Sequence, residues 1–188
     1  SAPVWLQQVH GVQVVDVGAG LEVPAEADAA FATRTGVVCS VLTADCLPLL
    51  LCHRQGTRGA AAHAGWRGLA AGVIEATVAA LELPTAELLV WLGPAISGPA
   101  YVVGDEVRAV FMSQSAESLE AFQPAPEGGW QADLYRLARQ RLAALGVDAV
   151  YGGERCTFRE PAQFYSYRRD GARSGRMASL VWLQDIDG

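Results

Sequence analysis

Apolar residues occur along this chain in short runs, and the spacing within each run predicts its secondary structure. Where apolar or small residues follow one another over about four to eight positions between Gly, Pro or polar residues, we expect strands. Two such runs flank His10-Gly11, which predicts a hairpin at this point. The predicted strands cover residues 4–9, 12–17, 37–43, 47–52, 59–63, 88–92, 147–151, 164–167 and 177–183.

Longer stretches show the helical spacing of three to four residues between apolar positions. This spacing predicts a helix over residues 69–81, which ends before Pro84, and a shorter one over 105–112. Asp133 is in position to cap a third helix that runs to Leu145. Strands and helices alternate irregularly, which favours an α/β (α+β) fold: a mixed β-sheet layered with helices in a single domain.

Composition narrows the class of protein. With 51% hydrophobic and 18% charged residues among 188, the chain can bury a full core. Its 14 basic residues, all arginine, face 20 acidic ones, so we expect no general nucleic-acid binding. We find no membrane-spanning run and no signal peptide. The four cysteines are irregularly spaced, so we expect free thiols in a cytoplasmic protein.

Three residues with metal-binding side chains lie at predicted strand ends or turns: His10, Cys46 and His63. One Cys and two His suit zinc, and three protein ligands leave a fourth position open, which is typical of catalytic zinc sites. By spacing alone the alternative stays open that His10 caps a turn and Cys46 is simply buried. The remaining histidine, His53, follows the predicted strand 47–52, and we expect it at a surface or turn.

Three arginines are candidates for binding an anion: Arg67, Arg168 and Arg169. Arg67 precedes the predicted helix 69–81, whose free N–H groups favour negative charge, and a guanidinium can grip phosphate with two hydrogen bonds. For the Arg168–Arg169 pair the alternative is an ion pair with a neighbouring carboxylate. Asp45 either orients a metal ligand, carries a proton in catalysis or caps a turn.

Seven segments in a fixed order resemble one family. They are QVHG, ADAAFATRTG, LTADCLPLLL, AAAHAGWRGLAAG, WLGPAISGPAYVVGDEV, DLYRLARQRLAALGV and CTF followed by FYSYRRDGARSGRMASLVWL. The most specific are HAGWRG and SYRRDG. The chain resembles, over essentially its whole length, the laccase-domain or multicopper polyphenol oxidase proteins, which are also called purine nucleoside phosphorylases and peptidoglycan editing factors.

The resemblance implies a zinc ion held by His10, Cys46 and His63. It also implies phosphorolysis of adenosine, inosine, guanosine and methylthioadenosine, and deamination of adenosine, with nucleoside and phosphate as small-molecule partners. Family members carry a further segment before the QVHG strand. We therefore expect residues 1–188 to form one catalytic domain that lacks this N-terminal segment.

Two other enzyme classes and one non-enzymatic class compete with this interpretation. A four-copper laccase needs on the order of ten His, and this chain has three, which excludes that architecture. Copper is expected at most at the same three ligands, where it would give weak oxidation of phenols. A Cys–His hydrolase would use Cys46 as nucleophile and His63 as base, and would suit the editing of a peptidoglycan precursor. An interaction module without activity would bind no metal.

Overall fold

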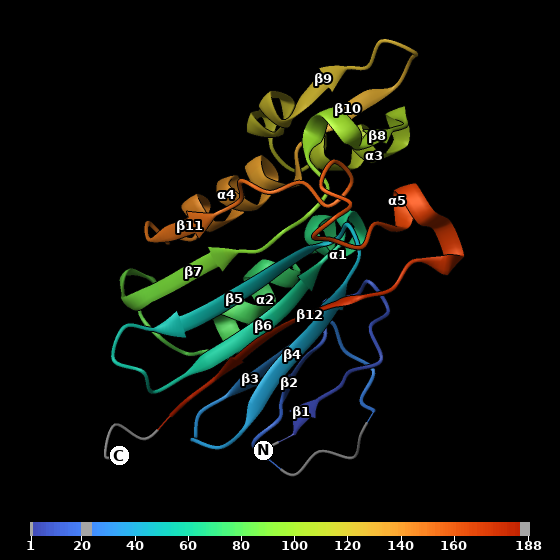
Figure 1. The fold of residues 1–188 in the computed structure, drawn as a ribbon. Coiled ribbons are helices and arrows are strands. Elements are labelled where there is room, and N and C mark those ends of the chain that lie inside the picture. Colours follow the sequence, from blue (N-terminus) through green and yellow to red (C-terminus); the bar gives the residue numbers. More distant parts are fainter. Residues whose placement is uncertain (1, 20–23, 185–188) are drawn as a thin grey trace.

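The computed structural model describes residues 2–19 and 24–184 (Figure 1). Its strands are β1 (Pro3–Val4), β2 (Val14–Asp16), β3 (Ala29–Ala32), β4 (Val38–Thr43), β5 (Leu47–His53), β6 (Gly59–Ala64), β7 (Leu88–Leu92), β8 (Val102–Val103), β9 (Phe122–Pro124), β10 (Trp130–Ala132), β11 (Val150–Gly152) and β12 (Met177–Trp182). Its α-helices are α1 (Trp66–Ala71), α2 (Val73–Ala80), α3 (Asp105–Met112), α4 (Leu134–Ala144) and α5 (Tyr167–Asp170), and four 3₁₀ turns complete it: η1 (Thr85–Glu87), η2 (Gly98–Ala100), η3 (Ala116–Ala121) and η4 (Gly171–Arg173).

The strands form three sheets. The largest has six strands in the order β11-β7-β5-β6-β3-β2, and it mixes parallel and antiparallel pairs. A second sheet, β1-β4-β12, lies over one face of it, and helix α2 covers the other face (Figure 1). The small sheet β8-β10-β9 lies apart from these layers. The expected α+β class with a mixed sheet is confirmed.

Side chains of β5 alternate between the two buried layers. Leu47, Leu49 and Leu51 are fully buried in the larger core, together with the apolar side of α2. Leu50 points the other way, into the smaller core beneath β4. The run 47–52 is therefore apolar at almost every position because both faces of this central strand are covered. None of the helices in the described part of the chain has the length and apolarity that a bilayer crossing requires.

The predicted hairpin around His10-Gly11 is wrong. Val4 pairs with Cys39 in β4, whereas Val14 pairs with Ala29 in β3, so the two runs enter different sheets. The Asp28 carboxylate accepts hydrogen bonds from the N–H groups of Val9, His10 and Gly11. This buried contact folds the loop against the start of β3, and the sequence pattern of the two runs contains no sign of it.

Three further predictions differ from the structure. The helix predicted over 69–81 is two helices, α1 and α2, because Gly72 adopts φ 103° and interrupts the backbone between them. Residues 164–167 form no strand: Ser166 accepts a hydrogen bond from Arg169 N and caps α5. His53 is the last residue of β5 and is buried rather than on the surface. The helix capped by Asp133 is confirmed as α4.

Candidate metal centre

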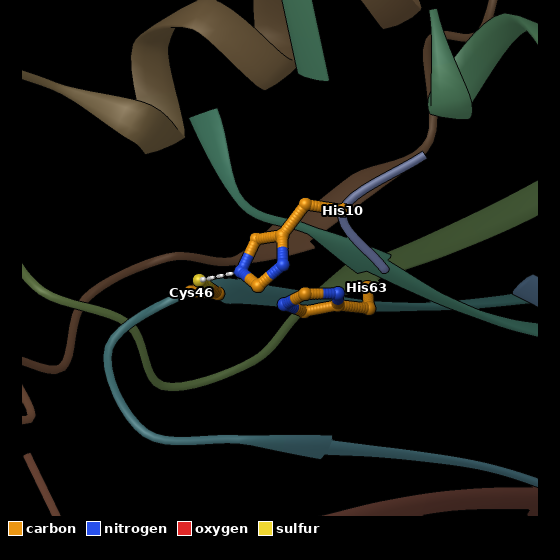
Figure 2. A group of neighbouring side chains, drawn as sticks. All are labelled: His10, Cys46 and His63. Carbon is orange, nitrogen blue, oxygen red and sulfur yellow. Dashed lines mark hydrogen bonds between the residues drawn. The ribbon is translucent and has the colours of Figure 1, made fainter. Parts of the chain in front are cut away.

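His10, Cys46 and His63 meet at one end of the six-stranded sheet. Cys46 directly precedes β5, and His63 lies near the end of β6, opposite Pro48 in the antiparallel register. His10 comes from the loop between β1 and β2. Figure 2 shows the Cys46 sulfur and both imidazole rings facing one another, with Cys46 Sγ 3.9 Å from His10 Nε2. The ligand atoms of all three lie within 4.8 Å of one another.

Asp28 holds both histidines in place. Its buried carboxylate accepts hydrogen bonds from His63 Nδ1 at 2.7 Å and from the backbone N–H of His10 at 2.9 Å. The bond to Nδ1 leaves His63 Nε2 facing the centre, so Nε2 is the ring nitrogen at which a metal ion would take the place of a proton. Burial raises the pKa of Asp28, but the hydrogen bonds from His63, Gly11 and Val9 outweigh it and keep the pKa below its usual range.

Two glycines of the HAGWRG segment make room for this arrangement. A Cβ at Gly65 would lie 2.8 Å from His10 Cδ2 and 3.0 Å from Cys46 Sγ. A Cβ at Gly68 would lie 2.9 Å from the Gly11 carbonyl oxygen. All three distances are too short for packed atoms, so the start of α1 can approach the His10 loop only because these positions lack side chains.

The protonation states of Cys46 and His63 depend on each other. Burial raises the pKa of Cys46, but hydrogen bonds with His10 and His63 outweigh it and lower the pKa to about 7. Burial lowers the pKa of His63, but its hydrogen bonds with Asp28 and Cys46 raise it to about 9. The centre therefore favours a thiolate at Cys46, and the thiolate is the form of cysteine that binds metals.

These three side chains could hold a metal ion. They offer one thiolate and two imidazoles, a donor set that suits zinc and other borderline metals. Among residues 2–19 and 24–184, no other group of three or more His, Cys, Asp or Glu side chains comes together in this way. The described residues therefore provide one three-ligand group, and not the set of sites that a four-copper enzyme needs.

The centre opens into a cleft of about 640 Å³, large enough for a small-molecule substrate. Its lining combines apolar side chains, the metal-binding residues and two arginines. The cleft is lined by Leu6, Gln8, His10, Leu42, Thr43, Ala44, Asp45, Cys46, His63, Ile96, Tyr101, Tyr167, Arg168 and Arg176.

The three arginines predicted to bind an anion occupy different positions. Arg168 lines the cleft, with its guanidinium 5.1 Å from the centre of the Tyr101 ring. Arg67 is exposed, with its guanidinium 4.5 Å from the centre of the Trp66 ring. It does not line the cleft, although its positive charge acts to lower the pKa of Tyr101. Arg169 does not face the cleft lining: its guanidinium bonds to the Asp170 carboxylate and to three carbonyl oxygens.

Sequence reasoning missed three residues of this site: Asp28, Tyr101 and Arg176. Asp28 stands two residues after Glu26 at the start of a run of small residues, and nothing in the sequence marks which of the two acids is buried. Burial raises the pKa of Tyr101 to about 12, so its hydroxyl stays protonated. Arg176 lines the cleft from the end next to β12, where no pattern in the sequence marks it.

Known proteins are similar in sequence to this chain over almost its whole length. Purine nucleoside phosphorylase PA4543 of Pseudomonas aeruginosa is 59% identical over 184 residues, which cover 97% of this chain and 75% of the relative. Purine nucleoside phosphorylase YfiH of Escherichia coli is 51% identical, with 97% of this chain and 74% of the relative covered.

Solved structures of relatives share the fold of this chain. The Neisseria meningitidis protein NMB0706 superimposes with a TM-score of 0.94 at 49% identity, over 97% of this chain and 76% of that one. YlmD from Geobacillus stearothermophilus gives a TM-score of 0.86 at 30% identity, over 97% of this chain and 73% of that one. Residues 1–184 match the family described as multi-copper polyphenol oxidoreductase laccase, and the chain belongs to this family.

Proposed function

We propose that this protein is a zinc-dependent purine nucleoside phosphorylase. One observation carries the proposal: the cleft that contains His10, Cys46 and His63 is also lined by Arg168 and Arg176, and within the described residues neither arginine pairs with a carboxylate. In the part of the chain that the structure describes, their guanidinium groups donate only to backbone carbonyl oxygens, that of Arg168 to Val102 and that of Arg176 to Ser174 and Gly175, so no acid neutralises their charge and they can bind an anion. Relatives named purine nucleoside phosphorylase support the same assignment.

Phosphorolysis requires a phosphate and a nucleoside in one cleft. A phosphate oxygen forms a bond to C1′ of the ribose while the bond from C1′ to the purine nitrogen breaks. The bonding electron pair leaves with the purine, which takes up a proton. Arg168 and Arg176 bind and orient the phosphate, and the protonated hydroxyl of Tyr101 is placed to donate a hydrogen bond to substrate.

His10, Cys46 and His63 would hold the zinc ion, with Asp28 fixing the orientation of both histidines. When bound, the ion supplies Lewis acidity at the wall of the cleft. We extend the proposal to the substrates adenosine, inosine, guanosine and methylthioadenosine, and to deamination of adenosine. Deamination replaces the amino group at C6 with water's oxygen and releases ammonia, and it involves no phosphate.

The test measures both reactions on the metal-loaded protein. We expect purine release from inosine to require phosphate, and ammonia release from adenosine to proceed without it. Arg168→Ala and Arg176→Ala each remove a candidate phosphate contact. Losing one charge-assisted contact costs about 1.5–3 kcal/mol, roughly ten- to a hundredfold in kcat/KM for phosphorolysis. Because deamination binds no phosphate, it should fall much less.

Arg54→Ala is the matched control, because Arg54 is an exposed arginine in the turn after β5, at the opposite end of the sheet. It should change neither reaction. An equal loss of both reactions in the Arg168 and Arg176 variants would show that these arginines support the fold instead. Absence of phosphate-dependent purine release in the wild type with full metal would disprove the phosphorylase assignment.

The lowered pKa of Cys46 also favours one competitor, the Cys–His hydrolase. The two candidates differ in their need for metal. A hydrolase that uses the free thiolate gains activity when a chelator removes the ion, and thiol alkylation then abolishes it. The phosphorylase loses activity on chelation and regains it when zinc is returned.

A further inference from the structure

Asp45 has an unusual backbone and a buried carboxylate. Its φ of 96° lies in a region that residues other than glycine rarely occupy. Its carbonyl oxygen accepts a hydrogen bond from Ile96 N at 2.9 Å, which holds the main chain next to Cys46. Such strain persists only where surrounding contacts fix the residue, and these contacts come from distant parts of the chain.

The carboxylate of Asp45 binds three donors near the C-terminal end of the chain. Oδ1 accepts a hydrogen bond from the Thr157 hydroxyl at 2.6 Å. Oδ2 accepts one from the Ser166 hydroxyl at 3.1 Å and one from the backbone N–H of Arg168 at 2.7 Å. The donors follow Asp45 by 112, 121 and 123 residues. Both oxygens of the carboxylate are therefore engaged with protein groups.

These contacts fix the start of helix α5. The Ser166 hydroxyl, which donates to Asp45, also accepts from Arg169 N, and the Arg169 guanidinium binds the carbonyl oxygens of Thr157 and Phe164. Residues 157–170 thus form one hydrogen-bonded unit attached to Asp45. Arg168 projects from this unit into the cleft over Tyr101.

We infer that Asp45 is a positioning residue: it ties the chain at Cys46 to the backbone of Arg168 and so fixes the distance between the metal centre and the anion-binding side of the cleft. The inference rests on the proposed function, in which phosphate binds at Arg168. It also favours one of the roles expected for this residue. Asp45 lines the cleft but is only 8% exposed, and both carboxylate oxygens accept hydrogen bonds from protein donors, which disfavours the proton exchange with substrate or water that a proton carrier needs.

Two substitutions at Asp45 separate positioning from proton transfer. Asp45→Gly removes the carboxylate and accepts the backbone φ without strain. Asp45→Asn also tolerates that φ; its amide oxygen can accept from Ser166 and Arg168, and its NH₂ group can donate to the Thr157 hydroxyl. For a positioning role we expect Asp45→Gly to raise the KM for phosphate about tenfold or more, while Asp45→Asn stays within about threefold of wild type.

Amide hydrogen exchange tests the hydrogen bonds of Asp45 without measuring activity. Amide hydrogen exchange in residues 164–170 should accelerate in Asp45→Gly and remain close to wild type in Asp45→Asn, while exchange in α4 stays unchanged in both. Metal content per chain should stay constant, because the hydrogen bonds of the Asp45 carboxylate go to Thr157, Ser166 and Arg168 and not to a metal-binding side chain. Thr157→Val removes one of the three donors with little change of shape, and we expect a smaller shift of the same kind.

Thr77→Val is the matched control, because Thr77 is a buried threonine of α2 whose hydroxyl donates only to the Val73 carbonyl. It should leave the KM for phosphate unchanged. The inference is overturned if Asp45→Asn loses kcat as severely as Asp45→Gly while the KM for phosphate holds, since only a proton-carrying carboxylate predicts that result. It is equally overturned if Asp45→Gly leaves both exchange and KM unchanged.

Failure of the proposed function gives a different pattern. If the wild-type protein shows no phosphate-dependent purine release, the phosphorylase assignment fails, and the exchange measurements alone decide the role of Asp45. Faster exchange over residues 164–170 in Asp45→Gly and rescue in Asp45→Asn would then still support positioning of Arg168, for whichever anion the cleft binds.

Discussion

Two buried histidines, His63 and His53, lie at opposite ends of the neighbouring strands β6 and β5. Each has one ring nitrogen close to a carboxylate: His63 Nδ1 lies 2.7 Å from Asp28, and His53 Nε2 lies 2.8 Å from Glu87. They differ in the second nitrogen. That of His53 is bonded to the Thr57 hydroxyl at 2.5 Å, whereas His63 presents its second nitrogen to the metal centre and the cleft.

This difference separates a structural histidine from a functional one. Burial and a carboxylate partner are common to both, so neither property identifies a site. His53 joins the turn after β5 to the 3₁₀ turn η1, and both of its nitrogens are used in doing so. At His63 the protein satisfies one nitrogen and leaves the other for a ligand from outside.

The largest effect is expected from removing the sulfur ligand of the metal centre, at the end of the sheet where His63 lies. Cys46→Ser replaces the thiolate with a hydroxyl, which stays protonated and is a poor ligand for zinc. We expect the purified variant to hold less than about a tenth of the wild-type metal and to lose activity at least about a hundredfold. Elemental analysis and nucleoside turnover measure both. Full metal retention in this variant would break the comparison, because the centre would not need its sulfur.

Asp28→Asn tests the carboxylate that orients His63. The amide oxygen can replace one of the two carboxylate oxygens, but the NH₂ group in place of the other cannot accept, and the charge that holds Nδ1 protonated is lost. Loss of such a partner lowers metal affinity about ten- to a hundredfold. Competition with a chelator measures the affinity. The matched variant Glu87→Gln alters the carboxylate next to His53 and should leave metal affinity unchanged.

Gly65→Ala tests the close approach of α1 to the His10 loop. Its methyl group would meet His10 and Cys46 at contact distances that require one of them to move. Overpacking of this kind costs about 1–3 kcal/mol, so we expect metal affinity to fall roughly tenfold. Gly98→Ala is the control, since a Cβ there meets its nearest neighbours at 3.5 Å or more. Equal metal affinity in the two variants would show that the loop adjusts without loss.

The smallest effect on the site is expected from His53→Gln. The side chain keeps one hydrogen bond at most, so the free energy of unfolding should fall by about 1–2 kcal/mol. Metal content and turnover should match wild type. Chemical denaturation measures the first quantity and elemental analysis the second. Loss of metal together with stability would show that the two ends of the sheet are coupled, and the contrast between the two histidines would no longer hold.

The metal-binding side chains could be predicted from sequence because the chain contains few His and Cys, and three of them stand beside Gly or Pro at the ends of strands. Asp28 could not be assigned, since its partners at His10 and His63 lie 18 and 35 residues away and only tertiary structure brings them together. The same reason explains the false hairpin and the helix at 167–170: each depends on a buried carboxylate, Asp28 or Asp45, that a local pattern does not show.

The strand pairings have a consequence for the order in which the protein becomes competent. The pairs β1–β4, β2–β3, β3–β6 and β5–β6 all lie within residues 3–64, the part of the chain that also carries His10, Asp28, Cys46 and His63. The part of the cleft that contains Arg168 and Arg176 forms only when β12 pairs with β4, and this pairing joins Met177 to Thr43 across most of the sequence. Because distant pairings form slowly, we expect refolding chains to capture metal first and to acquire turnover only afterwards.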